Sequence, residues 1–373
     1  MASDYVLALL APYSKENGGP LEIERVTFVE GRGNVIIKYP GTTDKIVSFV
    51  GSHLDVVPAD PVNWDRDPFV FSKEGDLLYG RGTTDCLGHV ALLTDFFATL
   101  AEARPTLKTT LACIFIANEE NGSFRGIGVD QLSLEGYMEF LKAGPVFWID
   151  AADSQPCQGT AGAIPWKLEV TGKLFHSGLP HKAINSIEMA MDCVNYIQTQ
   201  FYRDFARDPR EDDYSFTTCS TLKPTQISCT EGSLNQVPPA CTVQGDIRLS
   251  PFYDKDAAIA ALHRYVAEIN ADPSGVLKGD GSGVHGPHSK YTLPDEDRKG
   301  TVALTVFDGE NGIAVDMGSP GFQTLVAATK HVLNEVRPYA IGGTLPLVRE
   351  MQDSGFDLQI VGECHVKSYV ECG

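Results

Sequence analysis

Acidic and imidazole side chains that could bind a metal ion follow successive apolar segments in the first half of the chain. They are His53, Asp55, Asp85, Glu119, Glu120 and Asp150. Because ligand sites in open α/β sheets lie at the carboxyl ends of the strands, we expect these side chains at one sheet edge. One imidazole with several carboxylates suits a divalent ion such as Zn²⁺, Mn²⁺ or Co²⁺, whereas soft sites use thiolates. Shared carboxylates are also typical of two-metal hydrolases that activate a bridging water.

Each of these motifs also has a purely structural interpretation. A His-x-Asp tripeptide at a strand end is commonly a hydrogen-bonded pair, and adjacent glutamates are commonly solvated charges. Asp85 follows two threonines and could cap the helix predicted at 86–104. Asp150 competes with Asp153, and either could be a cap. Only their joint placement at successive strand ends favours a metal site.

The elements that must position these residues follow from the spacing of apolar side chains. Residues 46–52 and 107–117 have the β-branched, apolar composition of strands buried in a parallel sheet. The helix predicted at 86–104 lies between them. Strand, helix and strand in this order predict an α/β fold with a mostly parallel sheet flanked by helices.

The pattern of apolar residues changes after the first α/β region. The new pattern predicts a small α+β domain inserted into the α/β domain. Its strands alternate apolar and polar residues, as half-solvated antiparallel strands do. The predicted elements are strands 164–172, 242–248 and 302–307 and helices 184–203 and 257–271. Residues 273–300, rich in Gly, Pro, Asp and Lys, predict an exposed loop, and an amphipathic helix is expected over 320–336.

Composition narrows the class of protein. The chain has 373 residues, of which 43% are hydrophobic and 21% charged, which excludes a disordered chain. The formal charge is 30 − 49 = −19, which disfavours nucleic acid and anionic membranes and would attract a cationic substrate. No apolar stretch is long enough to span a bilayer, the N-terminus does not resemble a signal peptide, and the nine cysteines form no C-x-x-C motif. We therefore expect an intracellular, cytoplasmic protein with reduced thiols.

The motifs resemble those of the M20 family of dinuclear zinc aminoacylases, deacetylases and peptidases. The resemblance rests on His53-Leu-Asp55, Gly80-Arg-Gly-Thr-Thr-Asp85, Glu119-Glu120 and the segment Lys173-Leu-Phe-His-Ser-Gly178. Residues 250–254, 289–296 and 343–349 are similar to the acetylornithine deacetylases of plants within that family. The resemblance implies a discontinuous catalytic domain of residues 1–163 and 311–373, with residues 164–310 as an inserted lid and dimerisation domain.

The resemblance also implies a ligand set for two ions, Zn²⁺ or Co²⁺. His53 and Asp150 would be ligands of one ion, Asp85 would bridge the two, and Glu120 would bind the second. Asp150 is placed by its spacing from Pro156 and Gly162, and an aspartate there reaches one methylene less far than a glutamate.

Three further residues have catalytic roles in the family pattern. Asp55 would hydrogen-bond the far nitrogen of His53 and fix its tautomer. Glu119 would be the general base, which takes a proton from the attacking water and delivers it to the leaving amine. His176 would reach the active site of a neighbouring subunit and stabilise the oxyanion. Without the family context, His176 is an ordinary surface histidine.

Substrate binding is implied for four positions. Asn235, Arg248, Gly343 and Thr344 match residues that bind the amide and the carboxylate of the substrate. An arginine suits this task because its guanidinium can pair a carboxylate bidentately. Many family members have Asp where Leu345 stands, so that subsite is expected to differ.

The two ends of the chain depart from the family pattern. The family closes with a strand, a loop bearing a histidine ligand and a final helix, whereas here only eleven residues follow Gly362. His365 comes too early to match that histidine and lacks its expected surroundings. We therefore expect the second metal site to lack a ligand, and we expect the final helix and most of the first helix to be missing.

The activity implied by the resemblance is hydrolysis of N-acetylornithine to ornithine and acetate in arginine biosynthesis. The alternatives are a related aminoacylase or dipeptidase, a non-catalytic dimerising variant that binds at most one ion, and a structural protein without metal. The expected partners are an N-acylated amino acid and a second copy of the chain, with neither nucleic acid nor membrane. A plastid location is the alternative if an N-terminal segment is missing.

Overall fold

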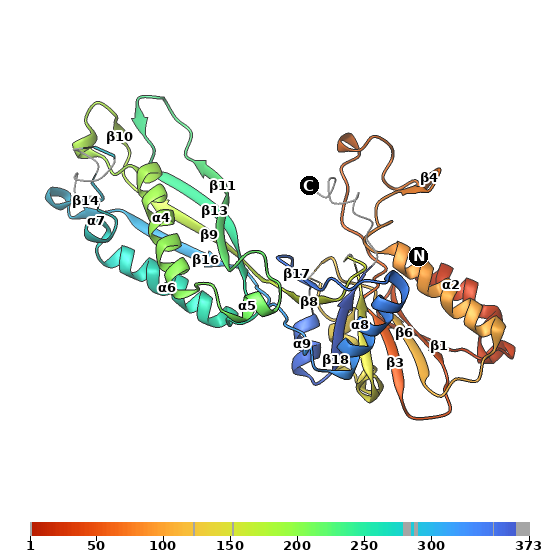
Figure 1. The fold of residues 1–373 in the computed structure, drawn as a ribbon. Helices are drawn as coiled ribbons and strands as arrows, with labels where there is room; N and C mark the ends of the chain where they lie inside the picture. Colours follow the sequence, from red (N-terminus) through yellow and green to blue (C-terminus); the bar gives the residue numbers. More distant parts are fainter. Residues whose placement is uncertain are drawn as a thin grey trace. The chain divides into compact units, whose positions relative to one another are not determined.

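The computed structural model describes residues 2–121, 124–150, 153–278, 285–286, 290–345 and 347–362, which form two compact units (Figure 1). Unit 1 comprises Met1–Gln158, Val315–Tyr339 and Pro346–Gly373. Unit 2 comprises Gly159–Ala314 and Ala340–Leu345. Each unit has its own sheet and its own hydrophobic core.

The sheet of unit 1 belongs to an eight-stranded sheet of order β1-β2-β6-β3-β7-β18-β8-β17, in which Gly159–Thr160 of β8 and Ala340–Ile341 of β17 are residues of unit 2. Its central strands β6, β3, β7 and β18 are mutually parallel, whereas β1 and β2 at one edge and β8 beyond β18 are antiparallel to their neighbours. The strands are β1 Glu22–Val29, β2 Arg32–Tyr39, β3 Ile46–Val50, β6 Thr110–Phe115, β7 Pro145–Ile149, β8 Cys157–Thr160, β17 Tyr339–Ile341 and β18 Asp357–Val361. This arrangement confirms the predicted α/β class.

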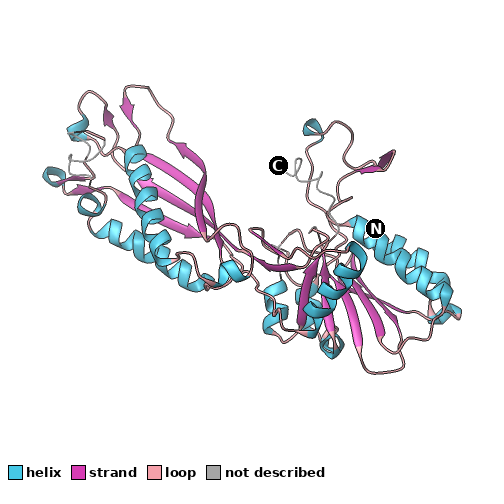
Figure 2. Cartoon of the chain, in the orientation of Figure 1, coloured by secondary structure: helices cyan, strands magenta, loops and turns pink. Residues whose placement is uncertain are grey.

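Helices cover the sheet of unit 1 (Figure 2). Helices α1 and α2 pack together, and the buried side chains of α2 meet those of β2 and β6, among them Phe97, Val35 and Phe115. Helix α8 packs against β7 and β18, and α9 packs against β18. The helices are α1 Ala2–Leu10, α2 Leu87–Ala103, α3 Val129–Leu134, α8 Pro320–Leu333 and α9 Val348–Asp353, and a hairpin joins β4 Ser72–Glu74 to β5 Leu77–Tyr79. Strand β6 is buried on both faces, as an apolar run in a parallel sheet should be.

Unit 2 is a four-stranded antiparallel sheet of order β11-β13-β9-β16, covered by α4 and α6. Along β9, buried residues alternate with more exposed ones, as the alternating sequence predicts. The elements are β9 Gly162–Thr171, β10 Phe175–His176, α4 Ser186–Asp204, α5 Arg210–Asp213, β11 Thr221–Cys229, β12 Gln236–Val237, β13 Ala240–Leu249, α6 Lys255–Ala271 and β16 Thr301–Val306.

One open alternative is decided, and two local predictions were wrong. Asp85 is hydrogen-bonded to His53 and is not the cap of α2, whose N-cap residue is Cys86 and makes no side-chain cap bond. Helix α8 ends at Leu333 rather than 336, because Asn334 adopts the left-handed conformation that ends helices. The predicted loop 273–300 contains short elements, namely α7 Pro273–Val276, β14 Thr292–Leu293 and β15 Arg298–Lys299.

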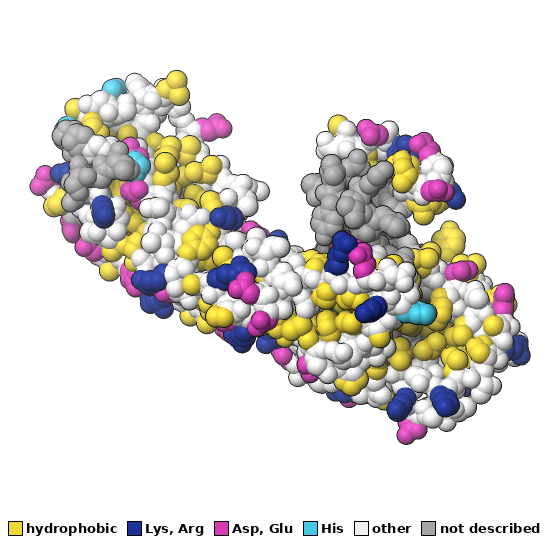
Figure 3. Space-filling model, viewed as in Figure 1, with side chains coloured by type: hydrophobic (Ala, Val, Ile, Leu, Met, Phe, Trp, Pro, Cys, Tyr) yellow, Lys and Arg dark blue, Asp and Glu magenta, His cyan; other side chains and the backbone are white. Residues whose placement is uncertain are grey.

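Charged side chains of both signs are visible on one face of the structure (Figure 3). On the face shown in Figure 3, acidic and basic groups are interspersed on each unit rather than gathered into one patch of a single sign. Among the described residues, no helix is both long and apolar enough to cross a membrane.

Candidate metal centre

The candidate site of unit 1 begins where β3, β6 and β7 end. Beyond β3, the N–H of Leu54 donates to the oxygen of Ile116 at 2.8 Å, and the Ser52 hydroxyl donates to the oxygen of Ile149 at 3.0 Å. Gly51 permits this convergence, because its φ is +97° and a Cβ there would lie 2.8 Å from the Trp148 ring. The ends of three strands are therefore tied together around His53.

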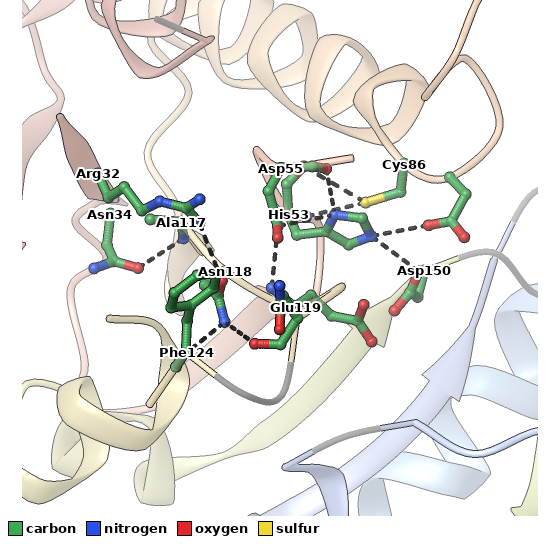
Figure 4. Close-up of polar contacts among 12 residues, drawn as sticks. Arg32, Asn34, His53, Asp55, Cys86, Ala117, Asn118, Glu119, Phe124 and Asp150 are labelled. Atoms are coloured by element: carbon green, nitrogen blue, oxygen red, sulfur yellow. Dashed lines mark hydrogen bonds and ion pairs between the residues drawn. The ribbon is translucent and has the colours of Figure 1, made fainter. Parts of the chain in front are cut away.

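His53 lies at the centre of the site, fully buried, with each ring nitrogen facing acidic residues (Figure 4). Its Nε2 is 2.8 Å from Oδ1 of Asp85 and 3.8 Å from Oδ1 of Asp150. Its Nδ1 is 2.9 Å from the backbone oxygen of Asp55 and 3.4 Å from Oδ1 of the same residue. The contact with Asp55 holds a proton on Nδ1, and Nε2, which donates to Asp85, is the ring nitrogen that would give up its proton to bind a cation.

Hydrogen bonds from neighbouring groups hold the carboxylates of Asp150 and Asp55 in place. The indole N–H of Trp148 donates to Oδ2 of Asp150 at 3.1 Å, while Oδ1 of Asp150 faces His53. Asp55 accepts from the backbone N–H of Glu119 at 3.0 Å. That bond connects the segment after β3 to the segment after β6, so it positions the Glu119-Glu120 pair relative to His53.

Cys86 is a member of the cluster that the sequence reasoning missed. Its Sγ accepts from the backbone N–H of His53 at 2.9 Å, and His53, Asp85, Cys86 and Asp150 have ligand atoms within 4.8 Å of one another. Burial raises the pKa of Cys86 to about 11, so it is a neutral thiol at physiological pH. Its position directly after Asp85 was the only signal in the sequence.

The acidic groups at this site crowd one another. Burial, followed by the charge of Asp150, raises the pKa of Glu119 to about 8. Burial and the charge of Asp85 also raise the pKa of Glu120. Burial opposes the charged form of His53, but its hydrogen bonds to Asp55, Asp85 and Cys86 outweigh this and raise its pKa. The site therefore attracts positive charge, and one imidazole among carboxylates, with the thiol neutral, fits a borderline or hard divalent cation.

Two buried asparagines, which the sequence reasoning also missed, hold the loop that carries the glutamates. The side chain of Asn34, on β2, accepts from the N–H of Ala117 at 2.8 Å and donates to the oxygen of Ile127 at 2.8 Å. Asn118 accepts from Arg32 at 3.1 Å and donates to the oxygen of Phe124 at 3.2 Å (Figure 4). The sequence offered one signal of this role, because Asn34 is an uncharged polar residue beside the apolar run of β2.

Unit 2 contains the remaining predicted site residues, in two groups. In the first, the Asn235 amide lies 3.3 Å from Nε2 of His176, and both residues are exposed. The N–H of Ser177 donates to the oxygen of Asn235 at 2.8 Å, and β10 pairs with β12 beside them.

The second group surrounds Arg248 on β13. Its Nη1 donates to the Thr344 hydroxyl at 3.4 Å, and its Nε donates to Asp246 at 2.7 Å. The Thr344 hydroxyl donates to the oxygen of Ala161 at 2.8 Å, and the Ala161 N–H donates to the oxygen of Gly343 at 3.0 Å. The acidic cluster lies in unit 1, whereas these two groups lie in unit 2.

A mostly parallel α/β sheet that gathers an imidazole and several carboxylates at one edge defines the class of metal-dependent hydrolases. Within that class, the chain belongs to Peptidase family M20/M25/M40, whose sequence profile matches residues 49–345.

Two relatives and one solved structure show how far the similarity extends. Over 360 residues, the chain is 52% identical to a protein named acetylornithine deacetylase from Arabidopsis thaliana, covering 96% of this chain and 80% of that protein. Over 375 residues, it is 47% identical to the protein of that name from Dictyostelium discoideum, covering 97% and 83%. The structure of human carnosine dipeptidase 1 is similar with a TM-score of 0.64 and 15% identity, covering 96% and 82%, a similarity of fold alone.

Proposed function

We propose that this chain is a metal-dependent amide hydrolase that converts N-acetyl-L-ornithine to L-ornithine and acetate, a step of arginine biosynthesis. The observation that carries the proposal is the convergence of His53, Asp85 and Asp150, whose ligand atoms lie within 4.8 Å of one another. The identity of 52% to the Arabidopsis thaliana deacetylase over 96% of this chain supports the substrate.

His53 and Asp150 would hold one divalent ion, Asp85 would bridge, and Glu120 would hold a second ion. Zn²⁺ or Co²⁺ suits this donor set, and a bound ion would supply Lewis-acid polarisation of the acyl oxygen and a lower pKa for the attacking water. Asp55 would keep His53 in the ligating tautomer. His365, the histidine closest to the position of the family's last ligand, lies outside the described residues.

The proton transfers fall to Glu119. A water molecule that attacks the acetyl carbonyl carbon loses a proton to the Glu119 carboxylate, and a tetrahedral intermediate forms. Glu119 then gives this proton to the amide nitrogen as the C–N bond breaks, which releases the free amine and acetate. Burial and the charge of Asp150 raise the pKa of Glu119 to about 8, so this carboxyl group can exchange protons near neutral pH.

Unit 2 would serve as the lid and dimerisation domain, and unit 1 as the catalytic domain. Arg248, Thr344 and Gly343 would bind the substrate carboxylate, and Asn235 the amide. His176 would donate a hydrogen bond to the oxyanion, from a neighbouring subunit. The mutual contacts of Arg248 with Thr344, and of Asn235 with His176, support these groupings.

The test combines metal analysis with an activity assay. The purified chain is loaded with zinc or cobalt, bound metal per chain is measured, and hydrolysis is assayed with N-acetylornithine and with other N-acyl amino acids and dipeptides. We expect bound metal, preference for N-acetylornithine, and loss of turnover in Glu119→Ala with metal retained. Two ions per chain would show that the second metal site is complete in spite of the ligand expected to be missing. The Glu24→Ala variant, which removes an exposed glutamate of β1, is the matched control.

Three results would redirect the proposal. Preference for another substrate would identify a related aminoacylase or dipeptidase. One ion per chain or fewer, with no turnover at any metal concentration, would identify a non-catalytic variant. Unchanged turnover in Glu119→Ala would remove Glu119 from the mechanism.

A further inference from the structure

Two cysteines of unit 2 lie directly opposite each other on neighbouring strands. Strand β11 lies beside β13 (Figure 1). Cys229 is the last residue of β11, and the antiparallel register pairs it with Cys241 on β13. Directly opposed residues of an antiparallel pair project from the same face of the sheet. Both cysteines are free thiols.

The backbone hydrogen bonds show that this pair has the close spacing. The N–H of Thr230 donates to the oxygen of Ala240 at 3.1 Å, so that adjoining pair is the hydrogen-bonded one. Since bonded and non-bonded pairs alternate, Cys229 and Cys241 form a non-bonded pair, for which the Cα atoms are about 4.5 Å apart. Disulfides join Cα atoms about 4.4–6.8 Å apart, so the spacing of this pair is within the range that a disulfide spans.

The two thiols differ in access, as an attacking and a resolving thiol should. Cys229 is exposed at the open edge of the sheet, whereas Cys241 is 1% exposed in the core of unit 2. Burial, with the neighbouring Cys229, raises the pKa of Cys241. A dissolved disulfide can therefore reach Cys229 but not Cys241.

We propose that Cys229 and Cys241 are a thiol–disulfide exchange site for a small dissolved disulfide of the glutathione type. Cys229, after losing its proton to water, attacks one sulfur of the small disulfide, and one small thiolate leaves and takes up a proton. The Cys241 sulfur then attacks the sulfur of Cys229 and gives up its proton, and the second small thiol leaves. Two protein thiols are oxidised to one disulfide, and one small disulfide is reduced to two thiols.

The bond would close the base of the loop that joins β11 to β13. That loop contains Asn235, which contacts His176, and β12, which pairs with β10. Oxidation would therefore restrict the segment that carries Asn235. The exchange site itself is independent of the proposed function. Only an effect of oxidation on turnover would rest on the proposed function.

The test is incubation of the full chain with glutathione disulfide, followed by alkylation and non-reducing peptide mapping. Cleavage after Glu231 separates Cys229 from Cys241 in sequence. The peptide that ends at Glu231 also contains Cys219, so fragmentation of the joined pair in the mass spectrometer must locate the bond at Cys229. We expect this link within one chain, with no shift to a two-chain band on a non-reducing gel. Dithiothreitol should remove it.

Variants distinguish the roles of the two thiols. Cys241→Ser should retain glutathione on Cys229 as a lasting mixed disulfide, and Cys229→Ser should leave Cys241 unmodified. Cys219→Ser, which removes another partly exposed cysteine of unit 2, should form the wild-type link. If Cys241→Ser does not fold, Cys241→Ala takes its place.

A lasting glutathione adduct on wild-type Cys229, a link through Cys219 or a link between two chains would overturn the proposal. So would the absence of reaction at Cys229. None of these results depends on deacetylase activity, so failure here is distinguishable from failure of the proposed function.

Discussion

Asp150 illustrates how one neighbour decides what a carboxylate can do. Trp148 donates to its Oδ2 at 3.1 Å, and its Oδ1 faces His53 at 3.8 Å. A carboxylate fixed in this way loses little conformational freedom when it binds a cation. Partners of this kind commonly affect metal affinity by about 10–100-fold.

We therefore expect Trp148→Phe to weaken zinc binding by about 10-fold or more while leaving the fold intact. Competition with a chromophoric chelator measures the dissociation constant. The matched control is Trp166→Phe in unit 2, because the indole nitrogen of Trp166 is buried and has no hydrogen-bond partner among the described residues. Equal zinc affinities in wild type and Trp148→Phe would show that the hydrogen bond from Trp148 to Asp150 does not contribute to metal binding.

Arg248 gives a second prediction at the residue scale. Hydrogen bonds to charged groups contribute about 1.5–3 kcal/mol, so Arg248→Ala should raise KM for N-acetylornithine about 10–100-fold. If the interaction is equal in ground and transition states, kcat stays nearly unchanged. Steady-state kinetics measure both constants, with Arg264→Ala, an exposed arginine paired with Asp204, as the control. A KM that does not change would place the substrate carboxylate elsewhere.

At the scale of elements, capping residues explain where several helices begin. Asn185 accepts from the N–H of Ile187 at 3.0 Å at the start of α4, and Asp254 accepts from two N–H groups at the start of α6. Helix α2 lacks such a bond, because Asp85 is engaged by His53. Asp85 thus belongs to the acidic cluster and does not cap α2, whereas α4 and α6 begin with the Asn and Asp caps that are typical of helix N-termini.

Asn185→Ala should lower the free energy of unfolding by about 1 kcal/mol, because it leaves N–H groups of the first turn without an acceptor. Urea unfolding followed by circular dichroism measures the change. Asn185→Asp retains the acceptor and should stay close to wild type. Equal destabilisation by both variants would mean that the amide of Asn185 has another role.

At the scale of the whole molecule, the proposed metal centre would couple folding of unit 1 to cation binding. Its carboxylates come from segments after several different strands and converge only in the folded chain. An ion that binds the native state alone stabilises it by mass action, by about 2.7 kcal/mol at 100 times its dissociation constant.

We therefore expect zinc to raise Tm of the chelator-treated protein, and chelator to lower it again. Differential scanning fluorimetry across a zinc titration provides the measurement. Asp150→Ala should show a much smaller rise, because it removes a proposed ligand while leaving the exposed acidic residues in place. A rise of the same size in that variant would locate the bound ions outside the cluster.

The sequence by itself determined the α/β class, most helices and strands, and the expectation that His53 and Asp85 lie at one sheet edge. These follow from local patterns: apolar spacing sets the element type, and parallel strands bring their carboxyl ends to one edge. The choice of Asp150 over Asp153 came from the resemblance to the family. Only the tertiary structure decided that Cys86 joins the cluster, that Asp85 faces His53 instead of capping α2, and that Asn34 holds the Glu119 loop. Likewise, only the strand register places Cys229 opposite Cys241. These are contacts between residues distant in the chain, and local sequence spacing carries no information about which distant partner a side chain will meet.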